Sequence, residues 1–338
     1  MENPNSNPGL SPSFGIEPVF LDRYPITSSQ AATAAVTLTL CLVGVVMRTY
    51  TRARILKQLD LSDLGLILAL LFFAAFTGVK LAANTYGQGQ HQWNVSVANL
   101  SHILLLANLL EILYGPTMFF AKYTVLRQIE SIFYKHQQSK GPSRLISALI
   151  WANLLFYLAI FFAFVFACVP RSKITNPTLP GRCISTNASI LATSAINVVS
   201  DISILIIPTV AVWNLQLTPK KKFGVSVVFA VGIFACIACI VRLYYSVKLT
   251  QSEDATWHIE PVGSLALAEF TTVILVACFP VLPRLFIELR NRNRAAHYEL
   301  SDTPEETSKL IAYLSPPMET SGMDSSWGLM SGTSLTAE

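Results

Sequence analysis

Long apolar stretches separated by short polar segments dominate the pattern along this 338-residue chain. Seven of them have the ~17–25 mostly apolar residues that a helix needs to cross about 30 Å of hydrocarbon. They lie at residues 29–50, 61–84, 102–126, 143–168, 189–213, 223–248 and 261–286. We expect helices, because backbone groups inside a bilayer must be hydrogen-bonded within their own segment. The pattern therefore predicts an all-α polytopic membrane protein, a bundle of seven transmembrane helices.

Polar segments flank the membrane domain, which the same pattern predicts over residues 29–286. Residues 1–28 hold five prolines and lack the apolar core of a cleavable signal peptide, so they predict a disordered extracellular segment. From residue 287 onward Ser, Thr, Pro and Glu dominate, a composition that buries too little apolar surface to fold. Residues 287–338 are therefore expected to form a disordered cytosolic tail.

Charge is scarce in this chain. Only 13% of the residues are charged, about half of the ~25% of an average soluble domain, which excludes a water-soluble globule. The net charge of +4 is too small to indicate a nucleic-acid partner. We therefore expect the lipid bilayer to be the main partner and no nucleic acid to bind.

The distribution of Lys and Arg predicts how the helices are oriented. The cytosolic side of a membrane protein carries the excess, and 16 basic residues fall on one side of the predicted spans against 6 on the other. This bias places the amino terminus outside and the carboxyl terminus in the cytosol. The Asn-x-Ser/Thr sequons at Asn94, Asn99 and Asn187 all fall in loops assigned to the outside, where glycosylation takes place.

The cysteines form two pairs with different expectations. Cys168 and Cys183 bracket a short segment on the oxidising side, which favours a disulfide over two unrelated thiols. Cys236 and Cys239 form a Cys-x-x-Cys pattern inside the sixth span, where we interpret them as small apolar residues. The sequence predicts no metal site.

Ionisable side chains at membrane depth are costly, so each is a functional hypothesis by default. At a rise of about 1.5 Å per residue, Glu111, Arg242 and Glu269 share a layer in the outer half of the bundle. Asp201 lies slightly deeper, near the midplane. The candidate pocket also includes polar neighbours of these residues, namely Asn108, Tyr114 and Asn197. Lys122 lies near an inner helix end, so we expect its ammonium to extend to the interface.

Two interpretations of these groups remain open. In the structural one, Arg242 pairs with Glu269 and Asp201 bonds to backbone or to Asn197, so the polar groups hold the bundle together. In the functional one, the carboxylates and Arg242 form the floor of an outward-facing pocket. The rim of this pocket would consist of aromatic and amphipathic side chains, namely His91, Trp93, His102, Tyr114, Tyr244, Tyr245 and Trp257.

Familiar catalytic and cofactor motifs are missing from the sequence. No P-loop, His-Glu-x-x-His or Gly-x-Ser-x-Gly occurs. The seventh span has no Lys, so a retinal Schiff base has no attachment point and no cofactor is expected. The remaining catalytic apparatus is carboxylate acid–base chemistry, for which Glu111, Asp201 and Glu269 are the candidate residues.

Several motifs occur in combination between residues 30 and 286. They are YGQGQHQW (86–93), EILYGPTMFFAKYT (111–124), CVP (168–170) with PGRC (180–183), NVVSDISILIIPTVAVWNLQL (197–217), the segment 232–242, Asp254 with Thr256, Glu269, and ACFPVLP (277–283). In this combination the chain resembles the fungal seven-transmembrane rhodopsin-domain integral membrane proteins. The resemblance implies a filamentous fungus and, often, a secondary-metabolite gene cluster, without one settled activity.

Three functions are compatible with these observations. A receptor would sense a small lipophilic ligand through the outer pocket and contact a cytosolic signalling partner through its basic inner loops. A membrane enzyme would use the buried carboxylates to cyclise or isomerise a lipophilic metabolite. A transporter ranks third, because the spans show no inverted repeat.

Overall fold

The computed structural model describes residues 8–11, 19–134, 140–176, 178–213 and 219–300. Seven of its helices are long and apolar enough to cross a membrane, in the order that the hydropathy pattern predicts. They are α1 (Ser28–Tyr50), α2 (Leu61–Thr85), α3 (Val97–Ile129), α4 (Lys140–Val165), α5 (Thr186–Trp213), α6 (Pro219–Gln251) and α7 (Ala255–Cys278). The predicted all-α, seven-span architecture is therefore confirmed.

Short elements lie between and after these helices. π-helical turns extend α1 and α3 over Thr51–Ile55 and Glu130–Tyr134. The remaining short elements are 3₁₀ turns at Gln92–Asn94, Arg171–Ile174 and Phe279–Val281 and the strands β1 (Cys168–Val169) and β2 (Arg182–Cys183). A further helix, α8 (Leu282–Leu300), follows the last of these turns.

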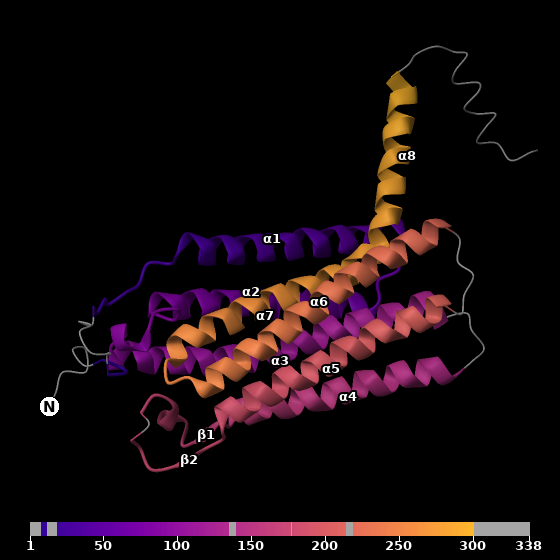
Figure 1. The fold of residues 1–338 in the computed structure, drawn as a ribbon. Helices are drawn as coiled ribbons and strands as arrows, with labels where there is room; N and C mark the ends of the chain where they lie inside the picture. The colour runs from indigo at the N-terminus through magenta and orange to yellow at the C-terminus, as the bar shows by residue number, and fades with distance from the viewer. Residues whose placement is uncertain (1–7, 12–18, 135–139, 177, 214–218, 301–338) are drawn as a thin grey trace, which may run out of the picture. The chain divides into compact units, whose positions relative to one another are not determined.

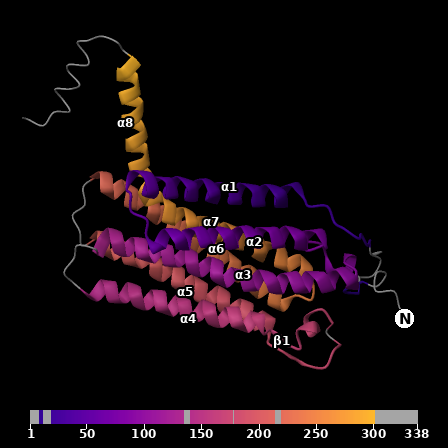
Figure 2. The same ribbon diagram turned by 180° about the vertical axis from the view of Figure 1, so that it is seen from behind.

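The seven long helices lie side by side as one bundle, and successive helices run in opposite directions (Figures 1 and 2). α3 lies in the middle of the packing, in contact with α2, α4 and α7. α1 packs on α2 and α7, and α5 packs on α4 and α6. The α2–α3, α4–α5 and α6–α7 connections share one end, called the disulfide end below. The α1–α2 connection lies at the opposite end, where α3 and α5 end and α4 and α6 begin.

Apolar side chains cover the outside of the bundle as well as its interior. Inside, the ring of Phe76 meets that of Phe270 edge-on, with 5.1 Å between the centroids. On α4 the large apolar side chains of Trp151, Leu155 and Phe162 are exposed. Exposed apolar faces of this kind mark contact with a membrane. The chain is therefore a multi-pass integral membrane protein in contact with the lipid bilayer.

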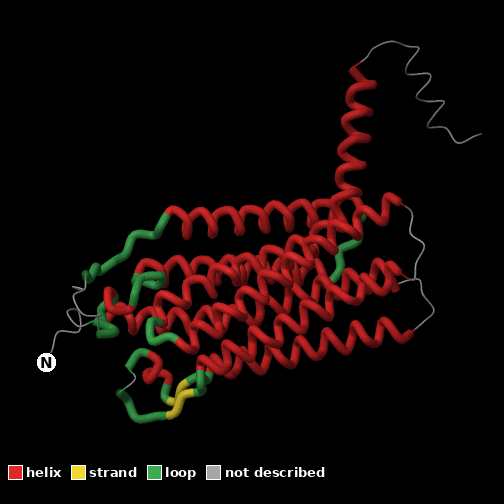
Figure 3. The backbone as a smooth tube through the Cα atoms, in the orientation of Figure 1, coloured by secondary structure: helices red, strands yellow, loops and turns green. Residues whose placement is uncertain are grey.

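A small hairpin lies in the connection between α4 and α5. β1 and β2 pair antiparallel with Cys168 opposite Cys183, and a disulfide joins these two residues. Figure 3 shows the hairpin in yellow at one end of a bundle drawn otherwise as helix and loop. The disulfide holds both ends of the intervening segment next to the ends of α4 and α5.

The segment before α1 contacts the α2–α3 connection, although the sequence predicts it to be disordered. Within the described parts of this segment, Tyr24 is buried and donates a hydrogen bond to the backbone oxygen of Asn94. The backbone N–H of Gly9 donates to Val95 O at 2.9 Å. One aromatic ring and a few backbone hydrogen bonds hold these parts of the segment. Neither gives a periodic apolar pattern that sequence reasoning could detect.

Asn99 lies in a helix rather than in the predicted loop. It belongs to the first turn of α3, and its backbone N–H donates to the capping Ser96 Oγ at 3.3 Å. Its side chain is 9% exposed, and its Nδ2 donates to Leu21 O at 3.0 Å. The polar first turn of a capped helix is hard to distinguish from a loop by composition. Of the other two sequons, Asn94 is half-buried and Asn187 is exposed.

The chain divides into two units after Phe286, and the second unit begins at Ile287. The described part of this unit is helical, because α8 continues to Leu300. The sequence instead predicts disorder from residue 287. The helix up to Leu300 is accounted for by good helix formers (Leu, Arg, Glu and Ala) and by an ion pair of 3.2 Å between Arg292 Nε and Glu288 Oε1. The rest of the predicted tail, residues 301–338, lies outside the described residues.

Candidate functional site

A network of charged and polar side chains is buried inside the bundle. Lys122 on α3 is fully buried, and its Nζ lies 2.6 Å from Asp201 Oδ1 on α5. The sequence predicts instead that Lys122 extends to the interface, and this expectation is wrong. In the structural interpretation, one of the two left open, Asp201 bonds to Asn197 or to backbone, whereas its ion-pair partner in the structure is Lys122. α3 continues past Lys122 to Ile129, and each of the two charges offers the other a partner at depth.

Asn197 on α5 connects this ion pair to two further helices. Its Oδ1 accepts hydrogen bonds from Lys122 Nζ and from Tyr157 Oη on α4, each at 2.6 Å. Its Nδ2 donates to Glu269 Oε1 on α7. A side-chain amide suits this position because it carries both an acceptor and a donor. Tyr157 is a member that the sequence does not indicate, since one Tyr in an apolar span is ordinarily a core residue.

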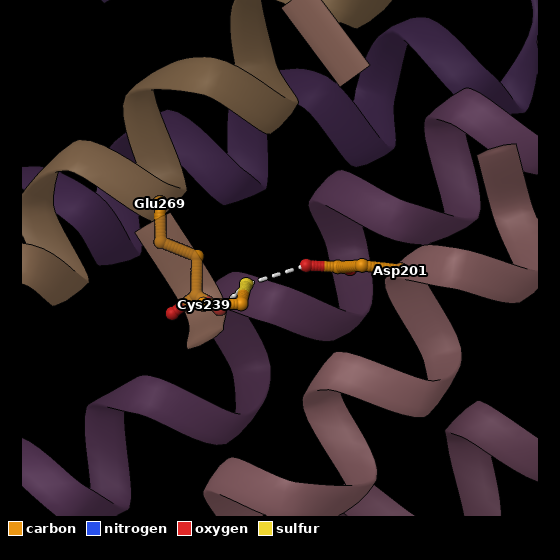
Figure 4. A group of neighbouring side chains, drawn as sticks. All are labelled: Asp201, Cys239 and Glu269. Atoms are coloured by element: carbon orange, nitrogen blue, oxygen red, sulfur yellow. Dashed lines mark hydrogen bonds between the residues drawn. The ribbon is translucent and has the colours of Figure 1, made fainter. Parts of the chain in front are cut away.

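Cys239 on α6 lies between two carboxylates, those of Asp201 and Glu269 (Figure 4). Its Sγ is 2.7 Å from Asp201 Oδ2 and also contacts Glu269 Oε1. The interpretation of Cys239 as a small apolar residue is therefore wrong. Cys239 precedes Arg242 by three residues, which puts both side chains on one face of α6. That spacing is the signal in the sequence that could have identified Cys239.

Arg242 on α6 faces Glu269 and Tyr114. Its Nε lies 3.1 Å from Glu269 Oε2 without the alignment of a hydrogen bond, so this contact is an electrostatic one. Its Nη2 donates to Tyr114 Oη at 2.6 Å, and the guanidinium lies 4.5 Å from the centre of the Tyr114 ring. Tyr114 Oη donates to Glu269 Oε2 at 3.1 Å. The structure thus brings together five of the predicted residues: Tyr114, Asn197, Asp201, Arg242 and Glu269.

The charges of this network balance. The carboxylates of Asp201 and Glu269 face the cations Lys122 and Arg242. Asp201, Cys239 and Glu269 also offer ligand atoms within 4.8 Å of one another, a grouping of the kind that binds metals and that the sequence does not predict. However, the two cations already contact these carboxylates. A metal ion would add positive charge at a place where no negative charge lacks a partner. The residues present therefore fit a metal poorly.

Glu111 and Asn108 on α3 do not join the network directly. Both lie closer to the disulfide end than the network does. Asn108 Nδ2 donates to Phe164 O at 3.1 Å, and its Oδ1 accepts from Arg171 at 3.4 Å. Glu111 is half-buried and within electrostatic range of Arg242, but it makes no hydrogen bond or ion pair with another described residue.

The structure stacks three of the predicted rim residues at the disulfide end. The His91 ring lies between those of Trp93 and Trp257, with centroid distances of 4.2 and 4.3 Å. His91 Nδ1 is 2.6 Å from Asp254 Oδ2 at the start of α7. We call these three rings the aromatic stack. The remaining predicted rim residues make their ring contacts elsewhere, namely His102, Tyr114, Tyr244 and Tyr245.

A second buried network joins four helices at the opposite end. Arg48 on α1 is fully buried, and its Nε lies 3.1 Å from Asp63 Oδ1 on α2. Its Nη1 donates to Gln128 Oε1 on α3 and to Ala277 O on α7. Arg48 belongs to the last turn of the predicted span 29–50, and the charge count includes it among the 16 basic residues of the cytosolic side. The structure buries it, because the π-helical turn Thr51–Ile55 extends the helix beyond it.

Comparison with known proteins matches residues 47–288 to the family described as "Fungal rhodopsin domain". The chain is 39% identical over 215 residues to the "SAT4 family membrane protein" of Emericella nidulans. This match covers 63% of the chain and 53% of the relative, so the chain spans about half of that protein's length.

Two further relatives carry names taken from biosynthetic gene clusters. The chain is 28% identical over 324 residues to "Fugralins biosynthesis cluster protein 2" of Gibberella zeae, a match covering 90% of the chain and 78% of the relative. It is 24% identical over 296 residues to "Polyenoic acids biosynthesis gene cluster protein Ba17b" of Metarhizium anisopliae, covering 79% and 78%. With well over half of its length matched and its seven apolar helices in place, this chain belongs to the fungal rhodopsin domain family of integral membrane proteins.

Proposed function

We propose that this chain is a membrane-embedded sensor of a small lipophilic molecule, acting in fungal secondary metabolism. The observation that carries the proposal is the charge-balanced network of Lys122, Asp201, Arg242 and Glu269, to which helices α3 to α7 all contribute. Ionisable groups inside a membrane are costly and mark functional sites by default. A ligand that alters one of these ion pairs changes contacts among five helices at once, which is what a receptor requires.

The ligand is proposed to reach the network from the disulfide end. Asn108 and Glu111 lie on α3 between that end and the network, and Glu111 keeps accessible surface. Both side chains offer polar contacts to a molecule entering between the helices. The names of two relatives, which refer to biosynthetic clusters, support a secondary metabolite as the molecule sensed.

The disulfide end is proposed to face outside. The excess of Lys and Arg at the opposite end supports this orientation. It puts the bond between Cys168 and Cys183 on the oxidising side. In the same orientation Asn94 and Asn187 are open to glycosylation, and the basic opposite end meets a cytosolic signalling partner.

A membrane enzyme is the second candidate, and one observation favours it. Among the described acidic residues of the seven spans, Glu111 is the one without a hydrogen bond or ion pair, so it is available for proton transfer to a substrate. Asp201 and Glu269 suit that role less well, because each already contacts a cation. An enzyme would therefore depend on Glu111.

Binding and turnover by the purified full chain in lipid nanodiscs separate the two candidates. The probes are a panel of lipophilic polyenoic acids and polyketides, with melting temperature and mass-spectrometric recovery of each probe as readouts. A sensor is stabilised by a probe that is recovered unchanged. Glu269→Gln should abolish the stabilisation, and Glu253→Gln, at an exposed position, should retain it. If the wild type converts a probe and Glu111→Gln does not, the chain is an enzyme and the proposal of a sensor is wrong.

A further inference from the structure

A separate polar cluster lies at the disulfide end, outside the network described above. Lys80 on α2 is 3% exposed, and its Nζ lies 2.6 Å from Glu260 Oε1 on α7. Ser264 Oγ donates to the same oxygen at 3.1 Å. Asn84, with its amide turned so that both atoms find partners, donates to Glu260 Oε2 at 3.1 Å. The positive and the negative charge are therefore matched, and the cluster is neutral as a whole.

Gln88, in the connection between α2 and α3, is a neighbour of this cluster that lacks partners of its own. Its side chain is 2% exposed, and neither Nε2 nor Oε1 has a hydrogen-bond partner among the described residues. Buried polar groups are almost always paired, because an unpaired amide loses its hydrogen bonds to water without compensation. Both atoms of this amide are thus available to a molecule that is not part of the chain.

Gly263 on α7 allows Lys80 and the Gln88 amide to approach this helix closely. A Cβ at this position would lie 3.1 Å from Lys80 Cε, tighter than an ordinary contact, and 3.9 Å from Gln88 Nε2. The backbone fixes Gln88 against α7 through the next residue, Gly89. Gly89 has φ +93°, which favours glycine, and its N–H donates to Thr256 O at 2.9 Å.

We propose that Gln88, beside Lys80, Glu260 and Gly263, binds the uncharged amide or lactam group of a small lipophilic molecule. Such a group carries a carbonyl acceptor and an N–H donor side by side, so it can pair with both atoms of the Gln88 amide. A carboxylate would face Glu260 and an ammonium would face Lys80, so the matched ion pair disfavours charged groups.

The aromatic stack lies on the same connection between α2 and α3 and on the first turn of α7, and Trp257 is 45% exposed. It offers an apolar surface to the rest of the molecule. This site would serve a sensor and an enzyme alike, so it does not rest on the proposed function.

Binding of octanamide to the full chain in lipid nanodiscs tests the proposal. Tryptophan fluorescence is a suitable readout because Trp93 and Trp257 lie in the aromatic stack. Octanoate and 2-decanone are the comparison probes, since the first is charged and the second lacks the N–H donor. We expect octanamide to bind about tenfold more tightly than either probe, the worth of one or two neutral hydrogen bonds.

Two variants locate the binding. Gln88→Met keeps the volume of the side chain and removes its amide, and Gln90→Met is the matched control at a half-buried position of the same connection. The affinity for octanamide should fall about tenfold in Gln88→Met and stay unchanged in Gln90→Met. The melting temperature of ligand-free Gln88→Met should be equal to or above that of the wild type, because an unpaired buried amide is gone.

Equal affinity of the wild type and Gln88→Met, or no binding of octanamide by the wild type, overturns the proposal. A lower melting temperature of Gln88→Met together with unaltered octanamide binding overturns the proposal as well. That result would show that the Gln88 amide forms hydrogen bonds with internal water rather than with the ligand.

Discussion

Lys122 Nζ and Asp201 Oδ1 lie 2.6 Å apart, and both side chains are almost completely removed from solvent. Replacing one partner, in Lys122→Met or Asp201→Asn, leaves the other as an uncompensated buried charge. We expect each single variant to lose about 3–5 kcal/mol of stability. The double variant should lose less than the sum, because it removes both charges. Thermal unfolding in detergent measures the four proteins as one double-mutant cycle.

Lys57→Met is the matched control for this cycle, because Lys57 is exposed in the connection between α1 and α2. Its melting temperature should equal that of the wild type. Strictly additive losses in the double variant would contradict a direct coupling between Lys122 and Asp201.

Cys239 and Cys236 offer an internal comparison within one Cys-x-x-Cys pattern. The thiol of Cys239 contacts Asp201 and Glu269, whereas that of Cys236 makes no side-chain hydrogen bond with another described residue. We expect Cys239→Ala to lose roughly 1–3 kcal/mol, because it leaves the buried oxygen Asp201 Oδ2 without the thiol donor, whereas Glu269 Oε1 keeps that of Asn197. Cys239→Ser, which keeps a donor, should lose less, and Cys236→Ala should lose least. Melting temperatures give the order, and an equal effect of both alanine variants would contradict a polar role for Cys239.

The positions of the helices can be predicted from the sequence, because a helix that crosses a bilayer needs a long, uninterrupted apolar stretch. The predicted span 61–84 differs by one residue from α2 (Leu61–Thr85). The ends of a helix are harder to predict from the sequence where their residues are polar. α3 begins at Val97 rather than at residue 102, since its first five residues include Asn99 and Ser101 and have the composition of a loop.

Partners across helices follow from the sequence only in part. The contact between Arg242 and Glu269 can be anticipated, because a fixed rise per residue places both at a similar depth. The pair Lys122–Asp201 cannot, because depth does not specify towards which neighbour a long side chain turns. The same limit applies to Arg48, whose partners come from three other helices.

Arg48 provides a prediction at the opposite end of the bundle. Its guanidinium contacts Asp63, Gln128 and the backbone oxygen of Ala277 at once. Arg48→Met should lose roughly 3 kcal/mol, because it leaves Asp63 buried without its main partner. Arg48→Lys should be nearly as unstable, because one ammonium cannot reproduce the planar fork of donors.

Melting temperatures of the two Arg48 variants are compared with those of Arg54→Met and Arg54→Lys. Arg54 is exposed in the neighbouring π-helical turn, so neither of its variants should alter the melting temperature. An Arg48→Lys protein as stable as the wild type would show that positive charge alone is needed at this position.

The disulfide between Cys168 and Cys183 closes a loop with a sequence separation of 15. In the chain-entropy model a loop of this size contributes about 3 kcal/mol by restricting the unfolded chain. Cys168→Ser, Cys183→Ser and the double variant should therefore lower the melting temperature by a similar amount, because any of them removes the same bond. A reductant should lower the melting temperature of the wild type and leave that of the double variant unchanged. The four free cysteines are buried and form no other disulfide, so a double variant that still responds to the reductant would contradict this assignment.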